Sequence, residues 1–288
     1  LENREFFGHP AGLYVLFCTE MWERFSFYLM LGLLFLYLTD SQKGGMGLHE
    51  AEASVIVGSY IALVYFTPFL GGLLADRVLG YRKTIVIGGI LMMLGHIVLA
   101  FPGWVGLYLG LGLLVLGNGA FKPNISALVG RLYPKDSPLR ARGFNIFYLG
   151  INIGAFICNF VAAFVRNSFD AHPQWGIGGW HAAFATAGVG MAVGLAIFLA
   201  YYRSFEGVDR RVGEDAQEQH EQPSLRPLWI ECLIPAVAVG AVCWLLETQL
   251  LHLGIGGPTA AFLGGCIPVV RFFVKMRGYW HRWRSGRA

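Results

Sequence analysis

The chain has 288 residues, of which 55% are hydrophobic and 14% are charged, and its mean hydropathy is +0.53. Soluble domains carry about 25% charged residues, so this composition excludes an ordinary soluble domain and indicates a membrane protein. The formal net charge of +4 comes from basic residues between apolar segments, which favours membrane topology over nucleic-acid binding as its cause.

Apolar segments predict an all-α protein whose helices cross the bilayer several times. A bilayer core of about 30 Å needs about 20 helical residues, and six segments reach or approach that length within a predicted bundle at residues 1–205. A seventh and an eighth are shorter or broken by glycine and proline. The segments are expected at residues 12–38, 54–75, 84–101, 104–129, 144–165, 182–202, 228–247 and 258–274.

The loops between these segments predict the topology. A charged, Gln-rich stretch at residues 206–227 is expected to be a flexible cytoplasmic linker. Residues 228–288 are expected to hold two further apolar helices and a basic cytoplasmic tail. In this layout most Lys and Arg residues fall on one side of the membrane, and only Lys43 and Arg166 fall on the other. We therefore expect a multi-pass protein of a bacterial inner or plasma membrane with both termini in the cytoplasm.

The first apolar segment carries three ionisable residues, Glu20, Glu23 and Arg24. Each costs at least about 2.5 kcal/mol at that depth, so the three must pair or face a polar cavity. On a helix they share one face, and Arg24 can pair with Glu20 at i,i+4. One cation cannot neutralise two carboxylates in a low dielectric, so one carboxylate is expected to bind and release a proton. The alternative is a purely structural buried network.

Another ionisable residue, Lys122, lies inside the fourth apolar segment beside Pro123. It could close an ion pair with a glutamate of the first segment and open it when that glutamate is protonated. Such a pair is a two-state element that both a proton and a substrate can bias. The alternative is that Lys122 extends to the cytoplasmic face along its aliphatic stem.

The turn after the second segment reads GGLLADRVLGYRKT at residues 71–84. Its spacing of glycine, acidic and basic residues resembles the loop between spans 2 and 3 of the major facilitator superfamily. That resemblance implies a role in conformational gating; the alternative is a basic cytoplasmic turn with glycines by chance. The residues that carry the pattern are Asp76, Arg77, Gly80, Arg82 and Lys83.

Three further motifs accompany this turn. They are ExxERFxxY at residues 20–28, FKPN at 121–124 and FYxxINxGAF at 147–156. Together they resemble the N-terminal half of the proton-dependent oligopeptide transporter family, also called the peptide transporter family, over residues 5–205. The resemblance implies a major facilitator fold: an N-terminal six-helix bundle followed by two linker helices.

The resemblance also implies roles for individual residues. Proton coupling is expected to involve Glu20, Glu23, Arg24 and Lys122. Substrate binding is expected to involve Tyr28, Tyr65, Lys122 and Asn152, with Lys122 answering the peptide carboxylate and Asn152 the peptide backbone. The chain departs from the family in having Phe27 before Tyr28 and Leu31 in place of an arginine, which puts the substrate preference in doubt.

The expected function is therefore proton-coupled symport of di- and tripeptides by alternating access, in partnership with a C-terminal transporter half that is missing from this chain. No enzymatic activity, cofactor or metal is expected. One alternative is a symporter of another small anionic or amino-acid-like solute, which Leu31 would suit. The other is a non-transporting membrane sensor or interaction subunit, against which the buried charges argue because a scaffold gains nothing from them.

Overall fold

The computed structural model describes residues 5–134 and 136–209. The chain divides into two units, Leu1–Glu218 and Gln219–Ala288, and the described residues all belong to the first. The predicted helices at 228–247 and 258–274, and all of the predicted linker except its first four residues, lie outside the described residues.

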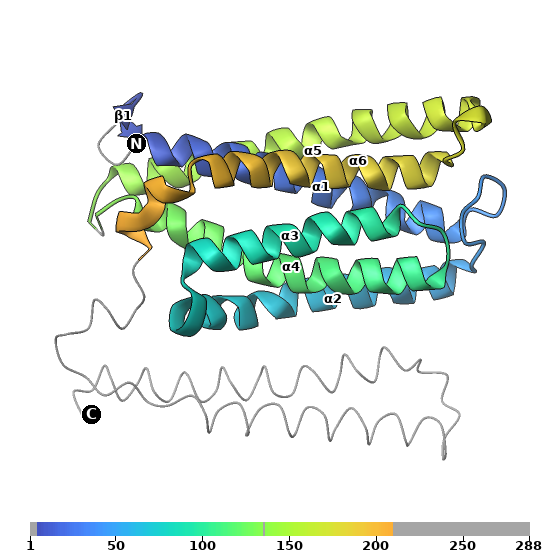
Figure 1. Ribbon diagram of the computed structural model, residues 1–288, viewed down its shortest axis with the longest axis horizontal. Helices are drawn as coiled ribbons and strands as arrows, with labels where there is room; N and C mark the ends of the chain where they lie inside the picture. The colour runs from blue at the N-terminus through green and yellow to red at the C-terminus, as the bar shows by residue number, and fades with distance from the viewer. Residues whose placement is uncertain (1–4, 135, 210–288) are drawn as a thin grey trace, which may run out of the picture. The chain divides into compact units, whose positions relative to one another are not determined.

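Six long helices make up the described unit (Figure 1). Each is long and apolar enough to cross a membrane, which confirms the first six predicted segments. Several extend beyond the predicted apolar limits, because backbone hydrogen bonding continues a helix into the polar residues that flank its apolar stretch. They are α1 Ala11–Thr39, α2 Glu50–Leu74, α3 Tyr81–Leu99, α4 Trp104–Arg131, α5 Leu139–Ala171 and α6 Gly179–Ala200.

Short elements connect the helices at their ends. A two-stranded antiparallel hairpin, β1 Glu5–Phe6 and β2 His9–Pro10, precedes α1. A π-helical turn, η1 Ala75–Leu79, continues α2, and 3₁₀ turns occur at η2 Pro173–Trp175 and η3 Tyr202–Val208.

The helices pack in two groups that lie side by side in Figure 1. Helix α1 contacts α5 and α6, while α4 contacts α2 and α3, and the α3–α6 contact joins the groups. Glycines allow the closest approach: a Cβ on Gly88 of α3 would lie 2.7 Å from the carbonyl oxygen of Gly117 on α4. Small residues of this kind let membrane helices pack backbone to backbone.

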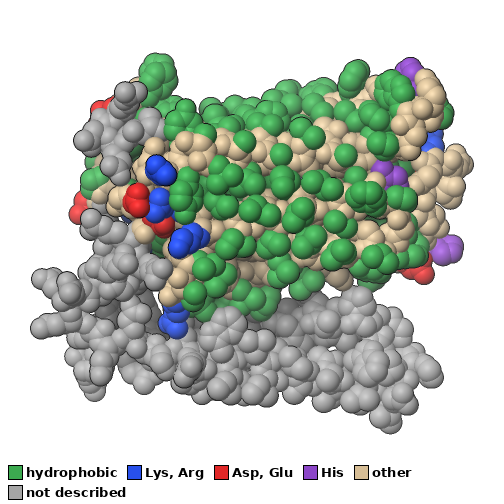
Figure 2. All heavy atoms as spheres, viewed as in Figure 1, with side chains coloured by type: hydrophobic (Ala, Val, Ile, Leu, Met, Phe, Trp, Pro, Cys, Tyr) green, Lys and Arg blue, Asp and Glu red, His purple; other side chains and the backbone are tan. Residues whose placement is uncertain are grey.

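Burial is uneven among the helices. The apolar stretches of α1 and α4 are 61% buried, whereas those of α2 and α5 are only 22% and 28% buried. Figure 2 shows hydrophobic side chains across the middle of the visible face, with Lys and Arg side chains gathered toward the end where α1 begins. This is the distribution expected of a surface that contacts lipid. The large exposed side chains of α2 and α5 include Tyr65, Phe66, Tyr148, Phe156, Phe160 and Phe164.

Candidate functional site

The three charged residues of α1 form one buried cluster. Glu23 is 0% exposed, and Glu20 and Arg24 are each 2% exposed. The Arg24 guanidinium binds both oxygens of Glu23: Nη2 donates to Oε1 at 2.6 Å, and Nε donates to Oε2. The same Nε lies 3.3 Å from Oε1 of Glu20. The expected i,i+4 contact between Glu20 and Arg24 is therefore present, but Glu23 holds the cation more fully.

The two carboxylates differ in how completely they are paired. Both oxygens of Glu23 accept hydrogen bonds from Arg24. Glu20 has an ion-pair contact through Oε1 only, and its buried Oε2 has no hydrogen-bond partner within the described ranges. A buried carboxylate oxygen without a donor is costly, so Glu20 is the less completely satisfied carboxylate of the pair.

Aromatic rings on the next turn of α1 cover the cation. The Arg24 guanidinium carbon lies 4.8 Å from the centre of the Phe27 ring and 6.0 Å from that of Tyr28. Such contacts add a cation–π attraction that strengthens when water is excluded. Phe27 is buried and Tyr28 is half-buried, so of the two rings Tyr28 is the more accessible.

Lys122 approaches this cluster from α4 without joining it. Its Nζ lies 5.2 Å from the centre of the Tyr65 ring on α2, and Lys122 is within electrostatic range of Glu20, Glu23 and Arg24. Within the part of the chain that the structure describes, it forms no ion pair with either glutamate. The predicted Lys122–glutamate pair is thus open in this conformation, and its closure stays a prediction.

The other predicted substrate residues lie on separate helices. Tyr65 is 72% exposed on α2, and Asn152 is exposed on α5, where its Nδ2 donates to the Tyr148 carbonyl at 3.0 Å. The structure brings Tyr65 and Lys122 together and places Tyr28 next to Arg24. Among the described residues, no hydrogen bond joins Asn152 to the other three.

The predicted gating residues lie at the far end of α2 and the start of α3. Asp76, in η1, accepts a hydrogen bond from the Tyr81 hydroxyl. Arg131, at the end of α4, donates through Nη2 to the same hydroxyl at 3.1 Å and places its guanidinium carbon 4.4 Å from the ring centre. The Asp76 carboxylate is therefore linked to α4 through Tyr81.

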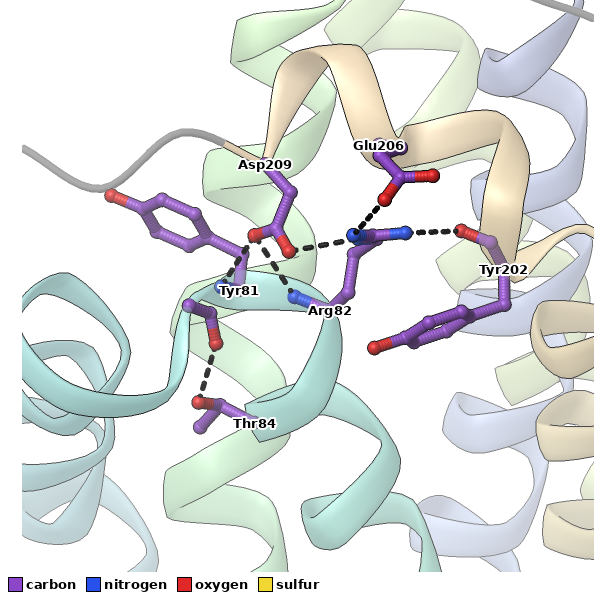
Figure 3. Close-up of polar contacts among 7 residues, drawn as sticks. Tyr81, Arg82, Thr84, Tyr202, Glu206 and Asp209 are labelled. Atoms are coloured by element: carbon purple, nitrogen blue, oxygen red, sulfur yellow. Dashed lines mark hydrogen bonds and ion pairs between the residues drawn. The ribbon is translucent and has the colours of Figure 1, made fainter. Parts of the chain in front are cut away.

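The other predicted gating residues take no part in this link. Arg77 and Lys83 are exposed. Arg82 turns toward the segment after α6, where its Nε donates to Oδ2 of Asp209 at 2.8 Å (Figure 3). Gly80 is the N-cap residue of α3 and has a φ of 78°, in the left-handed region that favours glycine.

Sequence reasoning missed several polar residues around these sites. Tyr60 of α2 is 3% exposed, lies within electrostatic range of Glu23 and Arg24, and has no hydroxyl partner within the residues described. Asp209 was also not predicted, and Tyr81, although it lies within the turn sequence at 71–84, was not among the predicted gating residues. A neutral tyrosine gives no charge signal in the sequence. Asp209 lies 127 residues from Arg82 in the chain, so no local sequence pattern could identify it as a partner.

Six apolar helices packed around a buried charge cluster form a membrane bundle of the major facilitator fold, and solved structures of peptide transporters share the arrangement. One is a crystal structure of a mutant peptide transporter POT in complex with alafosfalin. Its sequence is 38% identical to this chain and its TM-score is 0.71; the match covers 95% of this chain and 53% of that chain. Another crystal structure of mutant peptide transporter POT is 30% identical with a TM-score of 0.65, covering 99% of this chain and 71% of that one.

Sequence comparisons agree with the fold. The family model described as the POT family matches residues 82–217. The di-/tripeptide transporter of Lactococcus lactis subsp. lactis is 40% identical over 281 residues, covering 95% of this chain and 54% of the relative. The chain therefore belongs to the POT family, and it spans about half the length of the curated relatives it matches.

Proposed function

We propose that this protein takes part in proton-coupled symport of di- and tripeptides by alternating access. The observation that carries the proposal is a buried cation, Arg24, which is shared between Glu20 and Glu23. Lys122 interacts electrostatically with all three residues. The similarity to a di-/tripeptide transporter supports peptides as the substrate class. The described bundle would supply one wall of the substrate pocket, and a second bundle would face it.

In this proposal Glu20 carries the proton and Glu23 anchors Arg24. Protonation of Glu20 would remove one of two negative charges from the cluster while leaving both oxygens of Glu23 paired. The attraction of the cluster for Lys122 would then weaken. Proton binding would thereby be coupled to the position of Lys122 through charge. A proton can shift the population of two conformations only if it binds one of them more tightly, and this coupling would supply that difference.

The substrate would be held by residues of four helices. Lys122, which forms no ion pair with either α1 glutamate, would bind the peptide carboxylate, and the exposed amide of Asn152 would bind the peptide backbone. Tyr28 and Tyr65 would line the pocket beside them. A carboxylate bound to Lys122 competes with the glutamates for the same cation, so substrate and proton would favour the same displacement of the lysine.

Gating would involve the turn that contains Asp76, Arg77, Gly80, Arg82 and Lys83. We place this turn and both termini in the cytoplasm, because the Lys and Arg residues of the loops concentrate on that side.

Leu31 favours a second candidate, a symporter of another small anionic or amino-acid-like solute. This residue is half-buried and packs against the apolar core of the bundle, where the family has a cation. A pocket with one cation fewer would discriminate less strongly for a peptide carboxylate.

Uptake into proteoliposomes under an imposed inward proton gradient tests both candidates in the complete transporter. Accumulation of labelled dipeptide, with an unlabelled amino acid competing poorly, is the result expected. Preferred accumulation of the single amino acid would support the second candidate instead, and gradient-independent uptake of either solute would overturn proton coupling.

A further inference from the structure

The chain that follows α6 returns to the N-terminus of α3. This segment, residues 202–209, is called the strap here; it consists of η3 and Asp209 (Figure 3). Oδ1 of Asp209 accepts hydrogen bonds from the backbone N–H of Tyr81 at 2.7 Å and of Arg82 at 3.2 Å. The Asp209 side chain is only 8% exposed, so these bonds are shielded from water.

Arg82 fixes the strap at further points. Its Nε donates to Oδ2 of Asp209 at 2.8 Å, and its Nη1 donates to the carbonyl oxygen of Tyr202 at 3.1 Å. The guanidinium carbon also lies 4.6 Å from the centre of the Tyr202 ring. Arg82 therefore binds both ends of the strap. Its own side chain is 13% exposed, so these contacts are largely shielded from water.

Helix α3 needs a partner from outside its own sequence. Its N-cap residue is Gly80, which has no side chain, and the helix has no side-chain cap of its own. Thr84 turns its hydroxyl back to the Gly80 carbonyl at 2.7 Å, so it leaves the first N–H groups unsatisfied. Asp209 supplies the missing acceptor together with a negative charge at the positive end of the helix.

Glycine at position 80 also makes room for this contact. A Cβ there would lie 3.2 Å from Oδ1 of Asp209, which is tighter than an ordinary contact. Glycine at position 80 is thus favoured for two reasons: its left-handed backbone conformation and the close approach of Asp209. The sequence pattern at the turn and the distant aspartate are parts of one arrangement.

We propose that Asp209 is a positioning residue for the α2–α3 turn, residues 75–80, and fastens it to the end of α6. Tyr81 connects the same turn to Arg131 of α4 through its hydroxyl. The ends of α3, α4 and α6 on this side of the bundle therefore move together with the turn. The fastening stands on the structure, and its role in gating rests on the proposed transport function.

Glu206 provides a matched control within the strap. It faces the same Arg82, but at 3.7 Å and with 71% of its side chain exposed. Exposed ion pairs of this kind contribute little. Replacement of Asp209 should therefore loosen the turn, whereas the same replacement of Glu206 should not.

Hydrogen exchange in the full-length protein in nanodiscs tests the fastening without any transport assay. In Asp209→Ala, the peptide that contains Tyr81 and Arg82 should exchange about fivefold to tenfold faster than in the wild type, the change expected from a lost helix cap. Asp209→Asn keeps an acceptor oxygen and should show a smaller increase. Equal exchange in Asp209→Ala and Glu206→Ala would overturn the proposal.

A transport measurement then tests the gating role. Asp209→Asn should lower the maximal rate of dipeptide uptake severalfold without changing dipeptide affinity, because Asp209 binds Tyr81 and Arg82 and none of the proposed pocket residues. A lower affinity with an unchanged maximal rate would overturn that role. If the wild type transports no peptide, the proposed function fails, while the exchange comparison still decides whether Asp209 fastens the turn.

Discussion

Arg24 binds both carboxylate oxygens of Glu23, the residue directly before it in α1, although the helical pattern favours Glu20 at i,i+4. Neighbouring positions on a helix normally diverge, but the long arginine side chain reaches both carboxylate oxygens of Glu23. The result is an unequal sharing of one cation. Glu23 is fully paired, and Glu20 keeps one buried oxygen without a hydrogen-bond partner among the described residues.

This asymmetry predicts different effects for the two carboxamide variants. Glu20→Gln should abolish proton-driven accumulation of dipeptide and leave counterflow measurable, because the Glu23–Arg24 pair stays intact. Glu23→Gln should lose stability as well, by about 3 kcal/mol, because it breaks the main pair of a buried cation. Uptake, counterflow and thermal unfolding in detergent separate the two. Accumulation at the wild-type rate in Glu20→Gln would remove Glu20 from the proton path.

Lys122 should determine the preference for a free peptide carboxylate. The wild type should bind a free dipeptide about tenfold more tightly than its amidated form, the usual worth of a charge-assisted hydrogen bond. Lys122→Ala should erase that difference. Lys43→Ala, at an exposed loop cation, is the control and should preserve it. If Lys122→Ala keeps the preference and changes only expression, the lysine has no part in carboxylate recognition.

Asn152 should contribute to peptide binding more than a similar residue on the same helix. Asn159 is also an exposed asparagine of α5, and both donate to the carbonyl four residues earlier, at 3.0 Å for Asn152 and 3.4 Å for Asn159. Asn152→Ala should raise KM for dipeptide about fivefold, from the loss of one hydrogen bond. Asn159→Ala should leave KM near the wild-type value. Equal effects of the two substitutions would argue against a specific contact by Asn152.

Asp40 should stabilise the opposite end of the bundle in a pH-dependent way. Burial alone would raise the pKa of Asp40, but hydrogen bonds from the Trp180 indole and from nearby backbone N–H groups outweigh it and lower the pKa. Its contribution is therefore fully present above the unfolded pKa of about 3.9 and is lost as the pH falls through the lower folded value.

The corresponding variant is Asp40→Asn. It should unfold at a lower temperature than the wild type at pH 7, by the equivalent of about 1 kcal/mol, and the difference should shrink as the pH falls below about 4. Thermal unfolding in detergent across this range measures it. A difference that is the same at pH 3 and pH 7 would show that the Asp40 charge has no stabilising role.

The six membrane helices could be predicted from the sequence because their signal is local. A run of about 20 apolar residues has few alternatives to a membrane-spanning helix, since every backbone polar group must be satisfied within the segment. The location of Glu20, Glu23 and Arg24 on one buried face followed equally from helical periodicity. The helix ends were less predictable, because polar flanking residues continue α2 and α5 beyond their apolar stretches.

Tertiary structure alone decided which partners the buried charges select. Side-chain torsions within a packed bundle determine that Arg24 pairs more fully with Glu23 than with Glu20 and that Lys122 lies over the Tyr65 ring. Asp209 caps α3 from 128 residues away from Tyr81, and only the folding of α6 back beside α3 brings the two together. Local sequence thus determined which segments become helices and where charges are buried, because those depend on composition and period. The pairing of those charges depends on distances between helices, which no local pattern contains.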